Sequence, residues 1–517
     1  MQKKRQIINI INFIRAIEPR DASVDLLYTT KKQIELMEKY QFSGTFLIQY
    51  DALLLPEYQE LLKTLDPTRY EIGIWYEVVK PLTDACGIEW TGRWEWDWHC
   101  HCGFSIGYDL PQREAMINEF FAKFKEVFGY YPRVFGSWLF DSHTIRYIND
   151  KYGLDAICNC KEQYGTDGYT LWGGYYGQAY YPARNNIFMP AQTDEQRLDV
   201  PLFRMLGSDP VYQYDFGMNL ETGAQTQGVI TLEPIYTVKG GGVPQWVDWF
   251  LAENFNGDCL TFGYAQAGQE NPFGWEKMKD GLIYQFAQFD ELQKTGRIEI
   301  EPFGKTGRWF KETYKDTPPS AITAHTAYDD PDKDSIWYST KYYRINLYGD
   351  HGIIRIRDIH LFDETYNDPF NDTICSDNEA TYETLPWIDG NRHTKHKILS
   401  GLYLVHEGTN ITYDGKMIFT DKGNGIAEVC FGEITFVLTP DMISIHAPWD
   451  FTLEHHIGSG NDHMPDTMLL CDQKLGLSYN GHLYTVKLAS GSFRTSQEII
   501  SHNGIVSIVF NHQKIKG

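Results

Sequence analysis

The stretch KKQIELMEKYQFSGTFLIQY, residues 31–50, shows the pattern that decides the fold. Its first part places Ile34 and Met37 on one face of a helix, and residues 44–48 form a short apolar run typical of a buried strand. Another apolar run, at residues 7–13, precedes this helix. Strand, helix and strand in this order predict parallel strands joined by a crossover helix.

The same alternation continues to about residue 315. It predicts seven or eight βα units and therefore an α/β fold with a TIM-like (β/α)7-8 barrel, complete or distorted. The predicted strands are residues 7–13, 44–48, 71–75, 133–139, 156–160 and 259–264. The predicted helices are residues 30–40, 57–65, 111–128, 142–152, 245–254 and 275–294.

Around Thr317-Pro-Pro-Ser320 the pattern changes to short alternating segments separated by Gly, Asn and Asp turns. This pattern predicts an antiparallel β-sandwich-like C-terminal domain. We therefore expect a barrel catalytic domain at residues 1–317 and a β-rich domain at residues 318–517. The predicted strands of the second domain are residues 353–356, 398–405, 426–438, 442–446, 483–488 and 505–510.

The composition excludes some classes of partner. A formal charge of −23 argues against binding nucleic acid or an anionic membrane surface, since both need a basic face. No apolar run reaches the length of a transmembrane helix, and the basic N-terminus lacks a convincing signal peptide, so we expect a cytoplasmic protein. The 34 Tyr, 29 Phe and 14 Trp suggest a surface that binds sugar rings. The composition is also compatible with a homodimer.

In β/α barrels the chemistry lies at the carboxyl ends of the strands. The loop after the first predicted strand carries Arg15, Glu18, Arg20 and Asp21. Arg15 could bind a substrate carboxylate with its guanidinium, and Glu18 or Asp21 could act as a general base. The alternative is a salt-bridge network within the loop, with Asp21 as a helix cap.

A second strand end lies within residues 132–144. It brings Trp138, Asp141 and His143 to the end of the strand or to the first turn of the following helix. His143 is a candidate proton donor, and Trp138 and Asp141 are candidate substrate contacts. Asp141 is also a plausible N-cap, and a histidine in a first helical turn is often simply exposed.

A third strand end, within residues 260–275, carries Gln269, Glu270 and Asn271. These side chains offer the hydrogen bonds that sugar hydroxyls need, and Glu270 is a candidate catalytic carboxyl group. The alternative is that they hold the loop in place. Arg204, within residues 203–215, could complete a pocket for an anion, and a structural ion pair is the alternative.

Residues 94–103 form a further candidate segment. An extended conformation places Trp94, Trp96 and Trp98 on one face and two histidines, His99 and His101, on the other. Histidines in this arrangement can bind a metal, but no third ligand is evident. We favour an aromatic wall that lines the substrate and predict no metal and no cofactor.

The N-terminal half resembles the glycoside hydrolase/polysaccharide deacetylase superfamily. The resemblance rests on three stretches, residues 32–48, 71–75 and 132–154. The second, Glu-Ile-Gly-Ile-Trp, stands where deacetylases carry E-I-G-x-H. Trp75 therefore replaces a metal-binding histidine, Gly136-Ser-Trp138 replaces R-P-P, and the Asp-Asp pair expected after the first strand is absent.

Among related barrels with a C-terminal β domain, the chain looks most like glycoside hydrolase family 156, the inverting exo-sialidases. The resemblance implies a catalytic pair made of an acidic residue, Glu18 or Asp21, and His143. It also implies substrate contacts from Arg15, Arg133, Arg204 and Asn346.

Together these observations predict a glycoside hydrolase that removes terminal sugars, with sialic acid as the favoured sugar and a small glycan or glycoside as substrate. One alternative is a metal-dependent carbohydrate deacetylase, in which His99 and His101 would replace the missing ligands. Another is a glycan-binding protein without catalytic activity.

Overall fold

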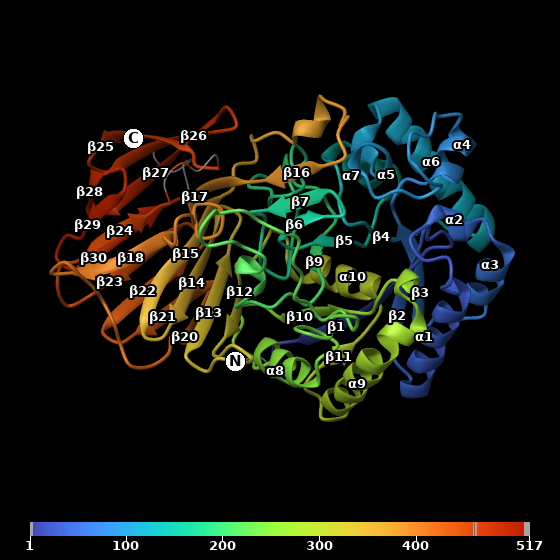
Figure 1. Ribbon diagram of the computed structural model, residues 1–517, viewed down its shortest axis with the longest axis horizontal. Helices are drawn as coiled ribbons and strands as arrows, with labels where there is room; N and C mark the ends of the chain where they lie inside the picture. The colour runs from blue at the N-terminus through green and yellow to red at the C-terminus, as the bar shows by residue number, and fades with distance from the viewer. Residues whose placement is uncertain (1–3, 459, 461–462, 511–517) are drawn as a thin grey trace.

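The computed structural model describes residues 4–458, 460 and 463–510. The chain folds into a barrel-like lobe and a β-rich lobe that lie side by side (Figure 1). The barrel-like lobe contains most helices, and the β-rich lobe is built from two large antiparallel sheets.

The centre of the barrel-like lobe is a nine-stranded sheet in which neighbouring strands follow the order β10-β1-β2-β3-β4-β5-β9-β8, with β11 on β1. All of its pairings are parallel except that of β8 with β9. The strands are β1 (Gln6–Ile14), β2 (Gly44–Ile48), β3 (Tyr70–Trp75), β4 (Val134–Gly136), β5 (Ala156–Cys160), β8 (Ala179–Tyr180), β9 (Leu202–Met205), β10 (Gly263–Ala267) and β11 (Glu299–Ile300).

The sheet curls but does not close into the complete barrel that eight units would give. The free edge of β9 is taken by the short antiparallel strand β8, so β9 does not pair with β10. Side chains bridge this opening instead, because the rings of Phe203 and Tyr264 lie 5.1 Å apart. The fold is therefore a mixed α/β half-barrel.

Strand β1 shows how the sheet packs on both faces. Ile8 and Ile10 belong to the apolar core between the sheet and its helices, whereas Ile7 and Ile11 belong to the core inside the curl. This alternation is the two-residue period of a strand buried on both faces. The surrounding helices are α1 (Leu26–Tyr40), α2 (Tyr50–Leu53), α3 (Pro56–Lys63), α4 (Lys80–Cys86), α5 (Cys100–Gly103), α6 (Leu110–Phe128), α7 (Ser142–Tyr152), α8 (Pro244–Asn254), α9 (Trp275–Lys294) and α10 (Phe303–Thr313).

The β-rich lobe consists of two antiparallel sheets with a shared apolar core, as the predicted sandwich requires. The ten-stranded sheet contains β12 (Ser320–Ala324), β13 (Lys333–Ser339), β14 (Tyr343–Asp350), β15 (Ile353–Leu361), β17 (Leu385–Asp389), β18 (Gly401–His406), β19 (Thr409–Asn410), β24 (Thr452–His456), β28 (Ser492–Thr495) and β29 (Glu498–Ile500). The eight-stranded sheet contains β20 (Ile418–Gly423), β21 (Ile426–Phe431), β22 (Ile434–Thr439), β23 (Met442–His446), β25 (Asp466–Cys471), β26 (Lys474–Tyr479), β27 (His482–Ser490) and β30 (Ile505–Val509).

The two lobes are joined by more than the chain connection. Strand β16 (Ala380–Glu383) leaves the β-rich part and pairs in parallel with β7 (Tyr169–Trp172), which forms a hairpin with β6 (Gln163–Thr166). Arg344 of β14 forms buried ion pairs with Asp358 and with Glu162, which follows β5. The β-rich lobe therefore supports the loops at the carboxyl ends of the barrel strands.

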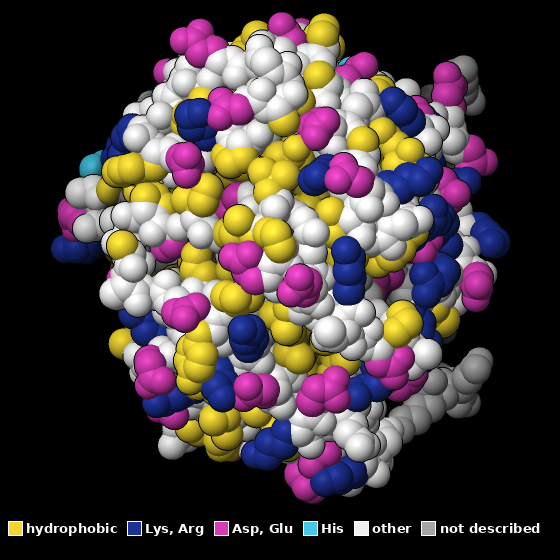
Figure 2. Space-filling view, turned by 90° about the vertical axis from the view of Figure 1, so that its right-hand side faces the viewer, with side chains coloured by type: hydrophobic (Ala, Val, Ile, Leu, Met, Phe, Trp, Pro, Cys, Tyr) yellow, Lys and Arg dark blue, Asp and Glu magenta, His cyan; other side chains and the backbone are white. Residues whose placement is uncertain are grey.

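The molecular surface is charged but mixed. Figure 2 shows the face that carries α2, α3 and α6, on which acidic and basic side chains alternate with apolar ones. Among the described residues, no helix is both long enough and apolar enough to cross a membrane.

Candidate functional site

The residues that follow the parallel strands meet at one edge of the curled sheet. Arg15 directly follows β1, Glu77 comes two residues after β3, and Glu270 lies three residues after β10. Parallel pairing of β1 with β10 and with β2, and of β2 with β3, brings these three strand ends together. This edge is where β/α barrels carry their active sites.

Arg15 lies at the centre of a group of carboxylates. Its Nη2 is 2.8 Å from Glu270 and 3.3 Å from Glu18, and its Nη1 is 3.9 Å from Glu77. The guanidinium also lies 3.9 Å from the centre of the Trp96 ring, in cation–π contact. Arg15 is 1% exposed, so its charge is screened little by water.

Two side chains fix the loop that carries Arg15. The amide of Asn271 donates to the Arg15 carbonyl at 2.8 Å and accepts from the Arg15 backbone N–H at 2.9 Å. One carboxylate oxygen of Asp51 accepts from the backbone N–H groups of Ala16 and Ile17, both at 2.8 Å. The loop after β1 is thus held against the loop after β10, which carries Glu270.

Glu270 has the electrostatics of a proton donor near neutral pH. Burial raises the pKa of Glu270 to about 7, with a further increase from the charge of Glu77, although Arg15 opposes the shift. One oxygen of Glu270 accepts from Arg15, and the other, Oε1, has no hydrogen-bond partner within the described part of the chain. Burial also raises the pKa of Glu77, against the opposing effects of Arg15 and of the Trp75 indole, which donates to Glu77 at 2.7 Å.

A third buried carboxyl group stands next to this pair. Glu233 lies in the loops after β9 and accepts hydrogen bonds from Thr231 at 2.8 Å and from Gln269 at 3.1 Å. Burial raises the pKa of Glu233 to about 7, partly offset by these two bonds. Gln269 therefore connects Glu233 to the loop that carries Glu270.

Glu18 and Arg20 form the outer part of the group. Burial acts to raise the pKa of Glu18, but the bonds and charges of Arg20 and Arg15 outweigh it and leave the pKa lowered. Both oxygens of Glu18 accept from arginines, so its role is to hold Arg15 and Arg20. Arg20 is 36% exposed and reaches Asp167, in the β6–β7 turn, at 3.8 Å.

The structure therefore assembles some of the residues predicted from the sequence. Arg15, Glu18 and Glu270 lie together, with Gln269 and Asn271 behind them. Within this set Asn271 binds the protein backbone and is fully buried, so it positions the site.

Other predicted residues lie elsewhere, each with its own partner. His143 is on α7 and bonds to Glu114 of α6 at 2.9 Å, beside a cavity lined by other α7 side chains. Arg133 precedes β4, at the opposite end of the strands, and pairs with Asp155 at 2.7 Å. Asn346 is buried within the ten-stranded sheet, where it bonds to Ser335, Ile336 and Arg357.

The remaining predicted residues have structural partners. Asp21 is on the surface, where it bonds to Ser23 and pairs with Lys277 at 3.7 Å. Asp141 caps α7 and pairs with Arg113 at 3.0 Å. Trp138 packs inside the curl, with its ring edge-on to Trp75 at 4.8 Å. Arg204 donates to the carbonyls of Cys160 and Tyr175, and its Nη2 has no partner among the described residues.

Three residues of the group were not predicted as site residues or as partners of Arg15. Glu77 follows Trp75 by two residues, so it continues the same strand face, and the strand-end rule could have identified it. Trp96 was predicted only as part of an aromatic wall. Glu233 lies far from any predicted strand end, and only the folded chain brings it to Gln269.

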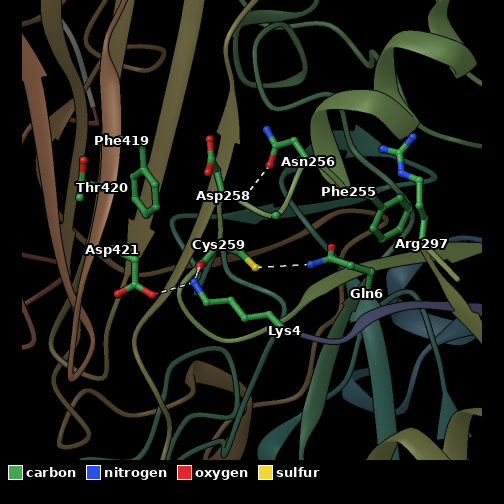
Figure 3. A pocket seen from close by; sticks show the side chains of 11 residues that line it. Lys4, Gln6, Phe255, Asn256, Asp258, Cys259, Arg297, Phe419, Thr420 and Asp421 are labelled. Carbon is green, nitrogen blue, oxygen red and sulfur yellow. Dashed lines mark hydrogen bonds and ion pairs between the residues drawn. The ribbon is translucent and has the colours of Figure 1, made fainter. Parts of the chain in front are cut away.

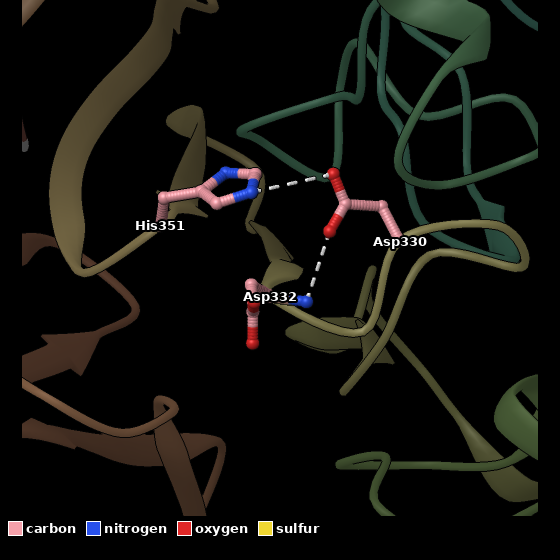
Figure 4. A group of neighbouring side chains, drawn as sticks. All are labelled: Asp330, Asp332 and His351. Atoms are coloured by element: carbon pink, nitrogen blue, oxygen red, sulfur yellow. Dashed lines mark hydrogen bonds and ion pairs between the residues drawn. The ribbon is translucent and has the colours of Figure 1, made fainter.

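No histidine of the described part of the chain joins this group of carboxylates. His99 pairs with Asp97 at 3.7 Å, and its ring lies 5.8 Å from that of His101. Within the described residues, one group of three potential metal ligands is close enough to share an ion, namely Asp330, Asp332 and His351 (Figure 4). It lies on the surface of the β-rich lobe, and two of its members are exposed.

A cavity of about 650 Å³ lies at the opposite end of the barrel strands, between the two lobes (Figure 3). The start of β1 and the loop before β10 line one side, and β20 lines the other. Lys4 spans the cavity. Its Nζ donates to the Cys259 carbonyl and lies 2.7 Å from a carboxylate oxygen of Asp421. This cavity is therefore separate from the carboxylate group around Arg15.

Comparison with known proteins gives a fold but no closer relative. No family model and no curated protein matches the sequence. A solved structure of a provisionally assigned glycoside hydrolase/deacetylase from Parabacteroides distasonis matches with a TM-score of 0.55 and 14% identity, over 74% of this chain and 92% of that one. A provisionally assigned polysaccharide deacetylase from Mycobacterium smegmatis matches with a TM-score of 0.37 and 12% identity, over 60% of this chain and 92% of that one. The fold is thus similar to that of the Parabacteroides distasonis structure.

Proposed function

We propose that the protein is a carbohydrate-active hydrolase, specifically an exo-acting glycoside hydrolase that uses Glu270 and Glu77. The observation that carries the proposal is the pairing of two buried carboxyl groups around Arg15 at the strand-end edge of the sheet. Glycoside hydrolysis usually employs a pair of carboxyl groups, one a protonated acid with a raised pKa and the other an ionised carboxylate that acts as base or nucleophile.

In the proposed mechanism Glu270 is the general acid. Its pKa of about 7 leaves about half of the Glu270 carboxyl groups protonated at pH 7 and most of them below it. The protonated group can give its proton to the glycosidic oxygen as the bond to the anomeric carbon breaks. Glu77 acts as the base: it takes a proton from water, whose oxygen bonds to the anomeric carbon. Arg15 stabilises the carboxylate form of both groups. Inversion at the anomeric carbon is the outcome expected from the resemblance to family 156.

An acidic sugar such as sialic acid remains the favoured substrate. Arg15 Nε is buried and has no hydrogen-bond partner among the described residues, which leaves one cationic donor for a substrate oxygen. With Glu270 protonated, Arg15 and Arg20 carry two positive charges against the carboxylates of Glu18, Glu77 and Asp167. Ionisation of Glu270 adds a negative charge, so an anionic sugar should bind more weakly above pH 7.

A metal-dependent deacetylase is the competing proposal, and its ligand set fits the site poorly. Deacetylases of this superfamily hold their metal with an aspartate and two histidines, whereas Arg15, Trp75 and Ser137 stand at the ends of β1, β3 and β4. Arg15 already supplies the positive charge that a divalent cation would bring to these carboxylates. No step of the mechanism is therefore assigned to a metal.

The test is hydrolysis of a panel of aryl glycosides, including a sialoside, with and without EDTA. Release of the aryl group at a rate that EDTA does not change supports the glycosidase proposal. Release from the sialoside supports an acidic sugar as the substrate. If the protein instead releases acetate from chitooligosaccharides and EDTA abolishes this release, the deacetylase would replace the glycosidase as the proposed function. Affinity for glycans without turnover of any substrate would favour a binding protein.

A further inference from the structure

Trp96 contacts Arg15 in the candidate site, but the other tryptophans of the same loop have no role there. Trp94 and Trp98 flank Trp96 in the segment between α4 and α5. The rings of Trp94 and Trp98 are stacked, with centroids 5.4 Å apart and planes inclined by 22°. Trp94 is 41% exposed, which is a large apolar surface to leave in water.

The segment is held rigidly by a buried carboxylate. Asp97 is fully buried and accepts two hydrogen bonds from the Arg93 guanidinium, at 2.8 and 2.9 Å. Burial opposes ionisation of Asp97, but the Arg93 bonds prevail and lower its pKa to about 2. Arg93 in turn lies over the rings of both Trp94 and Trp98, at 4.3 and 4.6 Å. The exposed rings are thus preorganised rather than free to collapse.

A continuous series of arginine–tryptophan contacts leads from these rings to the carboxylates. Arg20 lies over Trp98 at 5.3 Å and over Trp96 at 4.8 Å. Trp96 then contacts Arg15 at 3.9 Å, and Arg15 binds Glu270. Among the three tryptophans exposure falls from Trp94, at 41%, through the half-buried Trp98 to Trp96, which is 1% exposed.

We infer that Trp94 and Trp98 form a stacking platform for the sugar on the leaving-group side of the bond, so that the natural substrate is an oligosaccharide. The inference rests on the proposed exo-acting function: the terminal sugar occupies the buried end beside Glu270, and the rest of the chain must extend toward the exposed end. A neutral pyranose ring fits this place, because its apolar face covers an aromatic ring while its hydroxyl groups stay in water.

The test compares Trp94→Ala with wild type in two measurements. One is the affinity for cellotetraose, chitotetraose, lacto-N-tetraose and sialyllactose, followed by calorimetry. The other is hydrolysis of the fluorides of glucose, galactose, N-acetylglucosamine and N-acetylneuraminic acid, whose leaving group contains no sugar. Trp94→Phe retains an aromatic face, and Tyr130→Ala removes an exposed aromatic side chain at the distant end of α6 as a control.

We expect Trp94→Ala to weaken binding of the oligosaccharide about tenfold, equivalent to about 1.4 kcal/mol. Trp94→Phe and Tyr130→Ala should stay close to wild type, and fluoride hydrolysis should be unchanged in all three. Unchanged oligosaccharide affinity in Trp94→Ala, an equal loss on the fluorides, or no binding of any oligosaccharide by wild type would overturn the platform. If wild type hydrolyses none of the fluorides, the proposed function is contradicted. The affinity measurement still tests whether Trp94 and Trp98 bind a sugar ring.

Discussion

Glu270→Gln should stabilise the protein at alkaline pH while removing its proposed acid. Burial raises the pKa of Glu270 from an ordinary value of 4.5 to about 7. Because the folded pKa lies above the unfolded one, the ionised carboxyl destabilises the fold; the effect begins above pH 4.5 and is complete above pH 7. At 1.36 kcal/mol per pKa unit, its full size is about 3 kcal/mol. A glutamine stays neutral and resembles the protonated acid.

The assay is urea unfolding of both proteins between pH 4.5 and pH 9. The unfolding midpoint of Glu270→Gln should match wild type at the acid end and exceed it increasingly up to about pH 7, then by a constant amount. Glu276→Gln is the matched control, because Glu276 is an exposed glutamate at the start of α9 and should show no such trend. A Glu270→Gln variant that is less stable than wild type at pH 8 would refute the assigned pKa and its cause.

Three further predictions concern Glu270 again and two other buried groups, Lys161 and Arg344. The rate constant kcat/KM should fall as pH rises through about 7, where Glu270 loses its proton; a flat profile from pH 5 to 9 would contradict its role as acid. Burial lowers the pKa of Lys161 from its ordinary value of 10.5 to about 7. The positive charge of Lys161 therefore destabilises the folded state by its full amount below pH 7, by less as the pH rises, and not at all above pH 10.5. Lys161→Met should therefore be more stable than wild type at pH 6, with an advantage that shrinks toward pH 10; a constant advantage would count against this cause. Arg344→Met removes the arginine from the buried carboxylates of Asp358 and Glu162 and should destabilise the protein by about 3–5 kcal/mol in urea unfolding, whereas the exposed Arg494→Met should change little.

The elements of the barrel-like lobe were predictable because their patterns are local. The predicted strands 44–48 and 156–160 and helices 142–152 and 275–294 match the observed bounds. The helix beginning at Ser142 starts where it does because Asp141 caps it, accepting from the Thr144 backbone at 2.9 Å. The open sheet was not predictable, since a two-residue strand, β8, takes the edge of β9 without any sequence pattern of its own.

The site was predictable only where the side chain directly follows a strand. Arg15 and Glu270 were identified by that rule, and Glu77 satisfies it as well. Glu233 is placed by the path of a long loop, which no local pattern determines. His143 also follows a strand end in the sequence. In the structure it lies in the first turn of α7, and its ring bonds to Glu114 of α6 instead of joining the group around Arg15.

The measurement that tests the central claim most directly is sugar release by wild type, Glu270→Gln and Glu276→Gln on the same glycoside panel. We expect turnover of at least one glycoside by wild type, a loss of about 10²- to 10⁴-fold in Glu270→Gln, and no loss in the Glu276→Gln control. Equal turnover by wild type and Glu270→Gln would contradict the assignment of Glu270 as the acid. No turnover of any glycoside by wild type would contradict the proposed glycosidase.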